Sequence, residues 1–180
     1  MPNYGYTAGA PDLDYVKNPR QPDNNNYLAN NYFKFEFTRL PTVTYFCQQV
    51  NLPGIAFDVA RFPTTAGLPH KTPAGQYNYD NLNVSFMVDE NMKNWIEVYE
   101  WIQSIGILND ISDTIPHNDK FSNAVLTVMS SSYKPNLEIT FYDAFPVALS
   151  GIEFNSTLPD TIAIISTASF AFNYYTVKTL

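Results

Sequence analysis

The segment NYFKFEFTRLPTVTYFCQQVNLPG, residues 31–54, begins with the two-residue alternation of a β-strand. Phenylalanines at positions 33, 35 and 37 alternate with polar side chains, so one face of the strand is aromatic and the other is polar. The pattern predicts strands over residues 32–39 and 43–51, joined at Leu40-Pro41-Thr42 by a hairpin or a tight corner. We expect the aromatic face to lie in the core, which leaves the polar face free to meet a channel or a neighbour.

Residues 53–78 lose this alternation. They are rich in Pro and Gly and predict a long loop, and a loop of that length inside a compact domain is usually functional. One-sided alternation returns over residues 82–88 and predicts a further strand.

The segment VDENMKNWIEVYEWIQSIG, residues 88–106, changes to the period of an α-helix. We expect Asp89 or Asn91 to cap its start and Gly106 to cap its end. Trp101 lies off the apolar stripe and is therefore the tryptophan expected to contact a partner. The residues expected on the buried stripe are Met92, Trp95, Ile96, Tyr99 and Ile102.

Alternation in the C-terminal third predicts strands over residues 124–131, 137–142, 148–154 and 163–177, with a bulge at Ser150-Gly151. About seven strands and one helix define the expected fold class as mainly β, an antiparallel β-sandwich or barrel with one flanking α-helix. Residues 1–30 show no hydrophobic period and are rich in Pro, Gly, Asn and Asp. We expect them to form an extended N-terminal arm, with residues 31–180 as a single β domain.

Composition limits the classes of function. The 180 residues suit one domain, and an apolar content of 45% with 16% aromatic residues favours β-structure. A formal charge of -7 disfavours nucleic-acid binding. The sequence contains neither a signal-peptide pattern nor an apolar run long enough for a membrane span, so we expect a protein kept in a cytoplasm-like compartment without membrane contact. A single cysteine excludes an intrachain disulfide.

The sequence offers little catalytic chemistry. It has no Gly-rich phosphate loop, no G-x-S-x-G, no H-E-x-x-H and no paired C-x-x-C. Cys47, His70 and His117 are ligand types that zinc prefers, but their spacing follows neither a helix nor a hairpin. Glu97 and Glu100 are better explained as a solvated helix face than as an acid/base pair. We therefore expect no enzyme activity, no metal and no cofactor.

Three features in a fixed order carry a resemblance to a known family. The first is a strand with an aromatic-Cys pair that ends in Leu52-Pro53. The second is the acidic-Asn-Met turn of residues 89–92 leading into a Trp-bearing helix, and the third is the C-terminal ITFYDAFPVALSGIEFNSTLPDTIAIISTASFAFNYYTV. From about residue 31 to its end, the chain resembles the tail tube proteins of contractile-tailed bacteriophages.

The resemblance implies a structural virion protein of the phage tail, assembled in the host cytoplasm. It implies a homo-hexameric ring, rings stacked into a tube, contacts with sheath, baseplate and tail terminator proteins, and passage of genomic DNA without specific binding. Alternatives with the same architecture are a baseplate tube initiator, which the long arm leaves open, and a type VI secretion tube protein. An alternative of another class is a soluble glycan-binding β-sandwich that uses exposed Tyr and Trp101.

Three sets of residues are candidates for contacts in such an assembly. A DNA channel should carry acids and neutral polar groups on its wall, because repeated cationic contacts would retain DNA. The lumen-facing candidates are Glu36, Glu138 and Glu153, although each could equally form a salt bridge on the outside. The candidates for ring-to-ring contact in the 53–78 segment are Arg61, Phe62, Leu68, His70 and Lys71. The arm anchors, expected to lie against an adjacent subunit, are Tyr4, Tyr6 and Tyr15.

Overall fold

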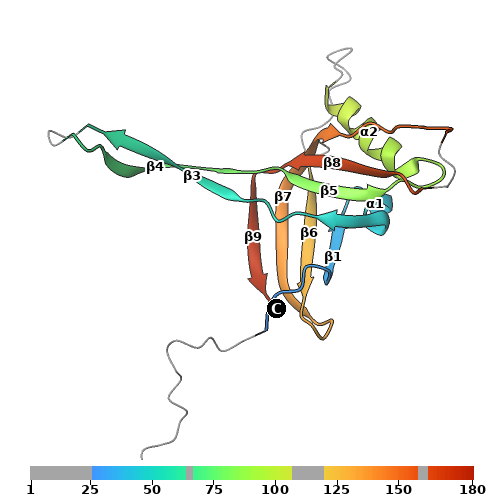
Figure 1. Cartoon of the computed structure of the whole chain (residues 1–180), viewed down its shortest axis with the longest axis horizontal. Helices are drawn as coiled ribbons and strands as arrows, with labels where there is room; N and C mark the ends of the chain where they lie inside the picture. Colours follow the sequence, from blue (N-terminus) through green and yellow to red (C-terminus); the bar gives the residue numbers. More distant parts are fainter. Residues whose placement is uncertain (1–25, 64–66, 107–119, 158–161) are drawn as a thin grey trace, which may run out of the picture.

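A computed structural model describes residues 26–63, 67–106, 120–157 and 162–180, and in it two antiparallel sheets share one strand. Sheet A contains β1 (Phe33–Phe37), β6 (Ser122–Met129), β7 (Pro135–Leu149) and β9 (Tyr174–Thr179). Sheet B contains β2 (Cys47–Val50), β5 (Leu82–Met87), β8 (Ile165–Ala171) and the C-terminal end of β7, residues 145–149. The strands of the two sheets run across one another, and the helix α2 (Lys93–Gly106) lies at one end (Figure 1). The expected mainly β, antiparallel fold class is confirmed.

The core lies between the two sheets and under α2. Its central side chains are fully buried and come from β5, β7 and β8, which explains why the one-sided alternation of these strands was readable in the sequence. The aromatic face of β1 is buried at positions 35 and 37, as expected. The buried hydrophobic residues are Phe35, Phe37, Leu40, Val43, Leu82, Val84, Phe86, Val98, Trp101, Ala124, Leu126, Ile139, Phe141, Ala144, Ala168 and Phe170.

The predicted strand over residues 43–51 is wrong in its first half, because the helix α1 (Pro41–Phe46) occupies that part of the chain. Pro41 stands where its fixed φ suits the first turn of a helix. The Thr44 hydroxyl donates to the Leu40 carbonyl at 3.0 Å and accepts the Phe37 N–H at 2.9 Å, which ties this turn to β1. The predicted hairpin is also wrong, since β1 pairs with β6 and β2 pairs with β5.

The predicted loop over residues 53–78 is a long two-stranded hairpin, which corrects the sequence interpretation. β3 (Ile55–Phe62) pairs with β4 (His70–Tyr79), and the hairpin projects away from both sheets (Figure 1). Between the pairs Phe57–Tyr77 and Val59–Pro73, β4 contains two residues more than β3. Gly75 lies in this bulge at φ +82°, a conformation open to glycine at no steric cost. The Pro and Gly residues that obscured the alternation are therefore part of an irregular strand.

The helix α2 is confirmed, but its predicted buried face is wrong. The buried side chains are Asn94, Val98 and Trp101, whereas Ile96 and Tyr99 are exposed. Asn94 was not expected in the core. It can be buried there because its side-chain amide is hydrogen-bonded: Nδ2 donates to the Met87 carbonyl at 2.8 Å. Its N–H donates to the Asp89 carboxylate at 3.2 Å, so Asp89 satisfies a free amide of the first turn as expected. A buried polar residue moved the apparent apolar stripe to the wrong side of the helix.

β7 passes from sheet A to sheet B at Asp143, which has a left-handed φ of 54°. The Asn173 side chain donates to the Asp143 carboxylate at 2.9 Å, and the Asp143 N–H donates to the Asn123 side chain at 3.3 Å. Asn173 lies in the gap between β8 and β9, so these three residues form a polar corner where strands change sheet. The predicted strands 137–142 and 148–154 are consequently one strand ending at Leu149, and the predicted strand 163–177 is two. The register shift lies between Pro146 and Ala148, not at Ser150-Gly151.

Candidate assembly surfaces

The projecting hairpin has one apolar face. It is formed by residues 55, 57 and 59 of β3 with 73, 77 and 79 of β4, because the registered pairs Ile55–Tyr79, Phe57–Tyr77 and Val59–Pro73 place them side by side. Ile55, Phe57 and Val59 are each about half exposed, as is Tyr77. The other face carries small or polar side chains such as Ala56 and Asp58. Contiguous exposed apolar surface of this kind is typical of a contact with another protein.

The base of the hairpin is anchored to the body by aromatic contacts. The Tyr79 ring lies 5.3 Å from the Phe172 ring and 5.1 Å from the Tyr175 ring, and Tyr77 stacks edge-on to Tyr79 at 5.4 Å. Desolvation raises the pKa of the Tyr79 hydroxyl, with a further contribution from Tyr77. The hairpin is therefore held at its base while its outer part extends into solvent.

The hairpin tip gathers all five residues that the sequence predicted as ring-to-ring contacts. We define the hairpin tip as Arg61, Phe62, Leu68, His70 and Lys71. Arg61 is registered opposite Lys71, and Phe62 opposite His70. Phe62 is 55% exposed and Leu68 is 79% exposed. Because two cations directly opposite each other repel, an anionic partner would stabilise the Arg61–Lys71 pair.

The outer face of sheet A is polar and carries two of the three lumen-facing candidates. Its registered row Lys34–Thr127–Glu138–Lys178 crosses all four strands, and Glu36 lies in the next row. Lys34 and Glu36 form an ion pair at 2.6 Å with both side chains more than half exposed. This face therefore holds two carboxylates and two ammonium groups, a balance that the sequence pattern did not predict.

Glu153 does not belong to this surface. It lies after the end of β7, in an exposed segment outside any strand, so the prediction that it sits on a strand face is wrong. The arm anchors Tyr4, Tyr6 and Tyr15 lie outside the described residues. Trp101, expected to contact a partner, is buried instead.

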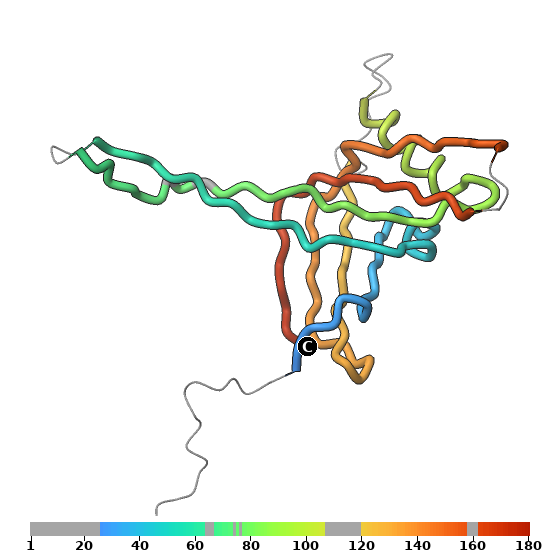
Figure 2. The backbone as a smooth tube through the Cα atoms, viewed as in Figure 1, coloured from blue at the N-terminus to red at the C-terminus, as the bar shows by residue number. Residues whose placement is uncertain are grey.

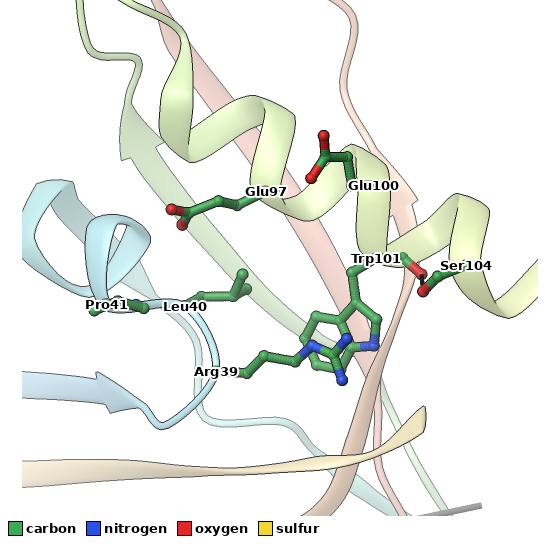
Figure 3. Close-up of a pocket in the computed structure, with 7 residues that line it drawn as sticks. All are labelled: Arg39, Leu40, Pro41, Glu97, Glu100, Trp101 and Ser104. Atoms are coloured by element: carbon green, nitrogen blue, oxygen red, sulfur yellow. Dashed lines mark hydrogen bonds between the residues drawn. The ribbon is translucent and has the colours of Figure 1, made fainter. Parts of the chain in front are cut away.

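Two hollows lie on the body of the protein. The first, of about 500 Å³, lies between α1 and α2 (Figure 3). The Arg39 guanidinium stacks over the Trp101 ring on one side of it, 4.8 Å from the ring centroid, and Glu97 on the opposite side accepts a hydrogen bond from Thr42. Glu100 and Ser104 of α2 complete its wall.

The second hollow, the connector groove, has a volume of about 280 Å³ and lies between the β5–α2 turn and the two ends of the β7–β8 connection. Sequence reasoning missed it, because its walls come from segments 60 residues apart that carry no common pattern. Phe154 is 76% exposed and Ile162 is 68% exposed at its rim. The side chains that line it are apolar except for two acids; they are Val88, Asp89, Glu90, Met92, Ile152, Phe154, Ile162, Ala163 and Ile164.

None of these surfaces resembles a catalytic centre. Among the described residues, no group of three or more His, Cys, Asp or Glu side chains is placed to hold a metal ion. The same part of the chain contains no helix that is both long and apolar enough to cross a membrane. Burial raises the pKa of the Cys47 thiol to about 11, which keeps it protonated and unreactive near neutral pH. An exposed apolar projection on a mainly β body is typical of a protein that contacts other subunits.

Comparison with known proteins identifies the assembly. The chain belongs to the phage tail tube protein family, which matches residues 16–178. It is similar to the tail tube terminator protein of Enterobacteria phage T4, with 29% identity over 136 residues that cover 73% of this chain and 76% of the relative. It is therefore a structural protein associated with the tail tube and not an enzyme.

Solved structures of contractile injection systems share the fold. The tube terminating cap of the anti-feeding prophage aligns with a TM-score of 0.66 and 18% identity, over 92% of this chain and 99% of the cap. A chain of the PVC sheath-tube complex, from an extracellular contractile injection system in its extended state, aligns with a TM-score of 0.64 and 16% identity, over 87% of this chain and 94% of that one. These likenesses show the fold, and the match of the family to residues 16–178 confirms the expected resemblance.

Proposed function

We propose that six copies of this chain form a closed ring that ends a phage tail tube, with the outer face of sheet A lining the channel. The observation that carries this proposal is the projecting β3–β4 hairpin, whose apolar face is exposed in the single chain and needs a second molecule to cover it. The hydrophobic effect therefore favours association of this chain with further subunits.

The width of sheet A supports a ring that passes DNA. Six four-stranded sheets with strands about 4.8 Å apart make a wall of about 115 Å circumference and about 37 Å diameter, before strand tilt widens it. Side chains about 5 Å deep on the inner face leave a channel of roughly 27 Å, which admits a DNA duplex. The aromatic face of β1 is buried, so the polar face is the one available to line this channel.

The terminal position in the tube is supported by the T4 relative, which is a tail tube terminator. One alternative role is a subunit of the tube body, which stacks ring upon ring. A second alternative role is the tube initiator at the baseplate end. The tube, sheath and baseplate proteins of the same virion tail are the expected partners, with assembly in the host cytoplasm. These roles differ in whether a ring of this chain stacks on another ring of the same chain.

Electron microscopy of the purified full-length chain tests the proposal. Single rings whose length does not grow with protein concentration, and which stop the elongation of tail tubes when added to growing tube protein, are the expected result. Long tubes formed by this chain alone would instead assign it to the tube body. A chain that stays monomeric at high concentration would refute ring formation.

The charge on the outer face of sheet A gives a second test. Glu36→Gln with Glu138→Gln leaves Lys34 and Lys178 without their acidic neighbours, which is two cations per subunit and twelve in a ring of six. Such rings should retain linear DNA at low salt and release it steeply as salt rises, because each phosphate contact contributes about -0.9 to the salt slope. Rings of the Glu153→Gln control should behave like wild type. Equal DNA retention by all three proteins would show that this face does not line the channel.

A further inference from the structure

We propose that the hairpin tip of one copy docks into the connector groove of a second copy of this chain. The proposal rests on the proposed ring and names the contact that closes it. It differs from the sequence-based expectation, in which these residues join one ring to the next.

The two surfaces match in their apolar character. The connector groove has a volume of about 280 Å³, which accommodates a few side chains and is too small for a whole domain. Phe154 and Ile162 stand exposed at its rim, and Ile152 and Ile164 line its wall. A narrow projection that carries the exposed Phe62 in its outer part is the type of occupant that such a groove admits. Docking removes exposed apolar surface from water on both partners, which stabilises the contact.

The two surfaces are also opposite in charge. Arg61 and Lys71 lie directly across from each other in the hairpin, where their mutual repulsion is unfavourable. Asp89 and Glu90 border the connector groove. The Asp89 carboxylate is partly used by the Asn94 N–H, whereas the Glu90 side chain is exposed. In a chain with a formal charge of -7, a cationic tip and an acidic groove favour one relative orientation of the two copies.

The positions of the two surfaces suit a ring. The hairpin extends from one side of the body, whereas the β5–α2 turn and both ends of the β7–β8 connection lie on the opposite side (Figure 1 and Figure 2). A contact between different patches on two identical chains is heterologous, and it repeats from copy to copy until the rotation closes a ring. Neither surface has to face itself, so each copy contributes one tip and one groove.

Two variants of the full-length chain separate the surfaces. The tip variant carries Arg61→Glu and Lys71→Glu, and the groove variant carries Glu90→Lys and Phe154→Ser; all four side chains are exposed, so both proteins should fold. Each variant alone should raise the concentration for half-maximal assembly at least about tenfold, as measured by analytical ultracentrifugation. Lys134→Glu, an exposed charge reversal in the β6–β7 turn, is the control and should assemble like wild type.

Mixing the two variants gives the decisive result. The groove of the tip variant and the tip of the groove variant are both intact, so the mixture should form a 1:1 dimer and nothing larger. A mixture that stays monomeric while wild type forms rings would overturn the proposed contact and leave ring formation standing, as would a tip variant that still forms rings. A monomeric wild-type chain would overturn both proposals. If the mixture forms dimers but wild-type rings fail to stop tube growth, the contact is supported and only the terminal position in the tube is refuted.

Discussion

Replacement of Trp101 by alanine should destabilise the fold far more than replacement of Trp95. Trp101 is buried, with its ring edge-on to Phe37 at 5.7 Å and Arg39 stacked 4.8 Å above its centroid. A large-to-small change of this kind costs about 3 to 5 kcal/mol. The lost aromatic geometry adds about 0.5 to 1.5 kcal/mol and the cation–π contact about 0.5 to 1 kcal/mol. Because these contributions overlap, we expect a total loss of about 4 to 6 kcal/mol.

Trp95 is only half-buried, and its contacts are correspondingly fewer. It stacks on Tyr99 with centroids 5.4 Å apart, and its indole N–H donates to the Ser150 carbonyl at 3.1 Å. The stacked pair contributes about 0.5 to 1.5 kcal/mol and the hydrogen bond about 1 kcal/mol. The expected loss for Trp95→Ala is therefore about 1.5 to 2.5 kcal/mol.

Urea denaturation measures both losses, and the sequence provides its own reporter. The chain has two tryptophans, so each single variant retains the other as a fluorescence probe, with circular dichroism as an independent signal. Trp101→Phe is the milder companion variant; it keeps most of the ring packing, loses the N–H bond to the Lys120 carbonyl, and should cost about 1 to 2 kcal/mol. A larger loss for Trp95→Ala than for Trp101→Ala would refute the helix orientation and return Trp95 to the core.

Four further outcomes are expected. Cys47 should react with iodoacetamide about 100-fold more slowly in the folded than in the urea-unfolded chain near pH 8, because burial raises the pKa of its thiol from 9.0 to about 11. The same shift contributes to the stability of the fold below pH 9, and this contribution is lost as the pH rises towards 11. Equal reaction rates in the two states would contradict the burial. Gly75→Ala should cost about 1 to 2 kcal/mol locally, since φ is +82° there, and hydrogen exchange should rise in the β3–β4 amides with the urea midpoint unchanged. Asp143→Ala should lower the free energy of unfolding by about 2 kcal/mol, since it removes the hydrogen bond from Asn173. Asp143→Asn should lower it by less, because Asn tolerates the left-handed φ of this position. Urea curves identical to wild type would rule out a structural role for the corner. Deletion of residues 1–24 should weaken assembly more than folding, and an unchanged assembly threshold would count against an arm that contacts a neighbour.

The parts of the fold that the sequence predicted are those whose burial is one-sided and regular. β5 alternates buried positions with exposed or half-buried ones along its length, and its predicted range of 82–88 matches Leu82–Met87 closely. The five residues predicted to make ring-to-ring contacts lie together at the hairpin tip because they fall in one segment, which is a hairpin and not a loop. The contact itself stays a prediction. A local sequence pattern is sufficient to predict a surface when all of its residues belong to one segment of the chain.

The remainder depends on specific side-chain hydrogen bonds and on one contact between distant segments. Pro41 and the Thr44 hydroxyl turn a strand-like pattern into helix α1, because the hydrogen bonds that fix it connect to β1. Asn94 is buried only since the Met87 carbonyl and Asp89 satisfy it. The connector groove exists only after the β5–α2 turn meets the β7–β8 connection. The hydrogen bonds of Thr44 and Asn94 join residues no more than 7 positions apart, whereas the groove joins distant segments. None of them follows from the spacing of apolar residues, so periodicity could not predict them.

β7 gives the subunit a mechanical property of its own. Fifteen residues run without a break from the strand that pairs with β6 and β9 to the strand that pairs with β8. A load that reaches sheet B is therefore passed to sheet A along covalent backbone, and sliding of one sheet over the other requires the whole strand to shift its register. The polar corner around Asp143 resists that shift with hydrogen bonds to Asn123 and Asn173. The two layers should therefore respond to tension together, since β7 runs through both sheets and the β8–β9 connection at Asn173 joins them a second time.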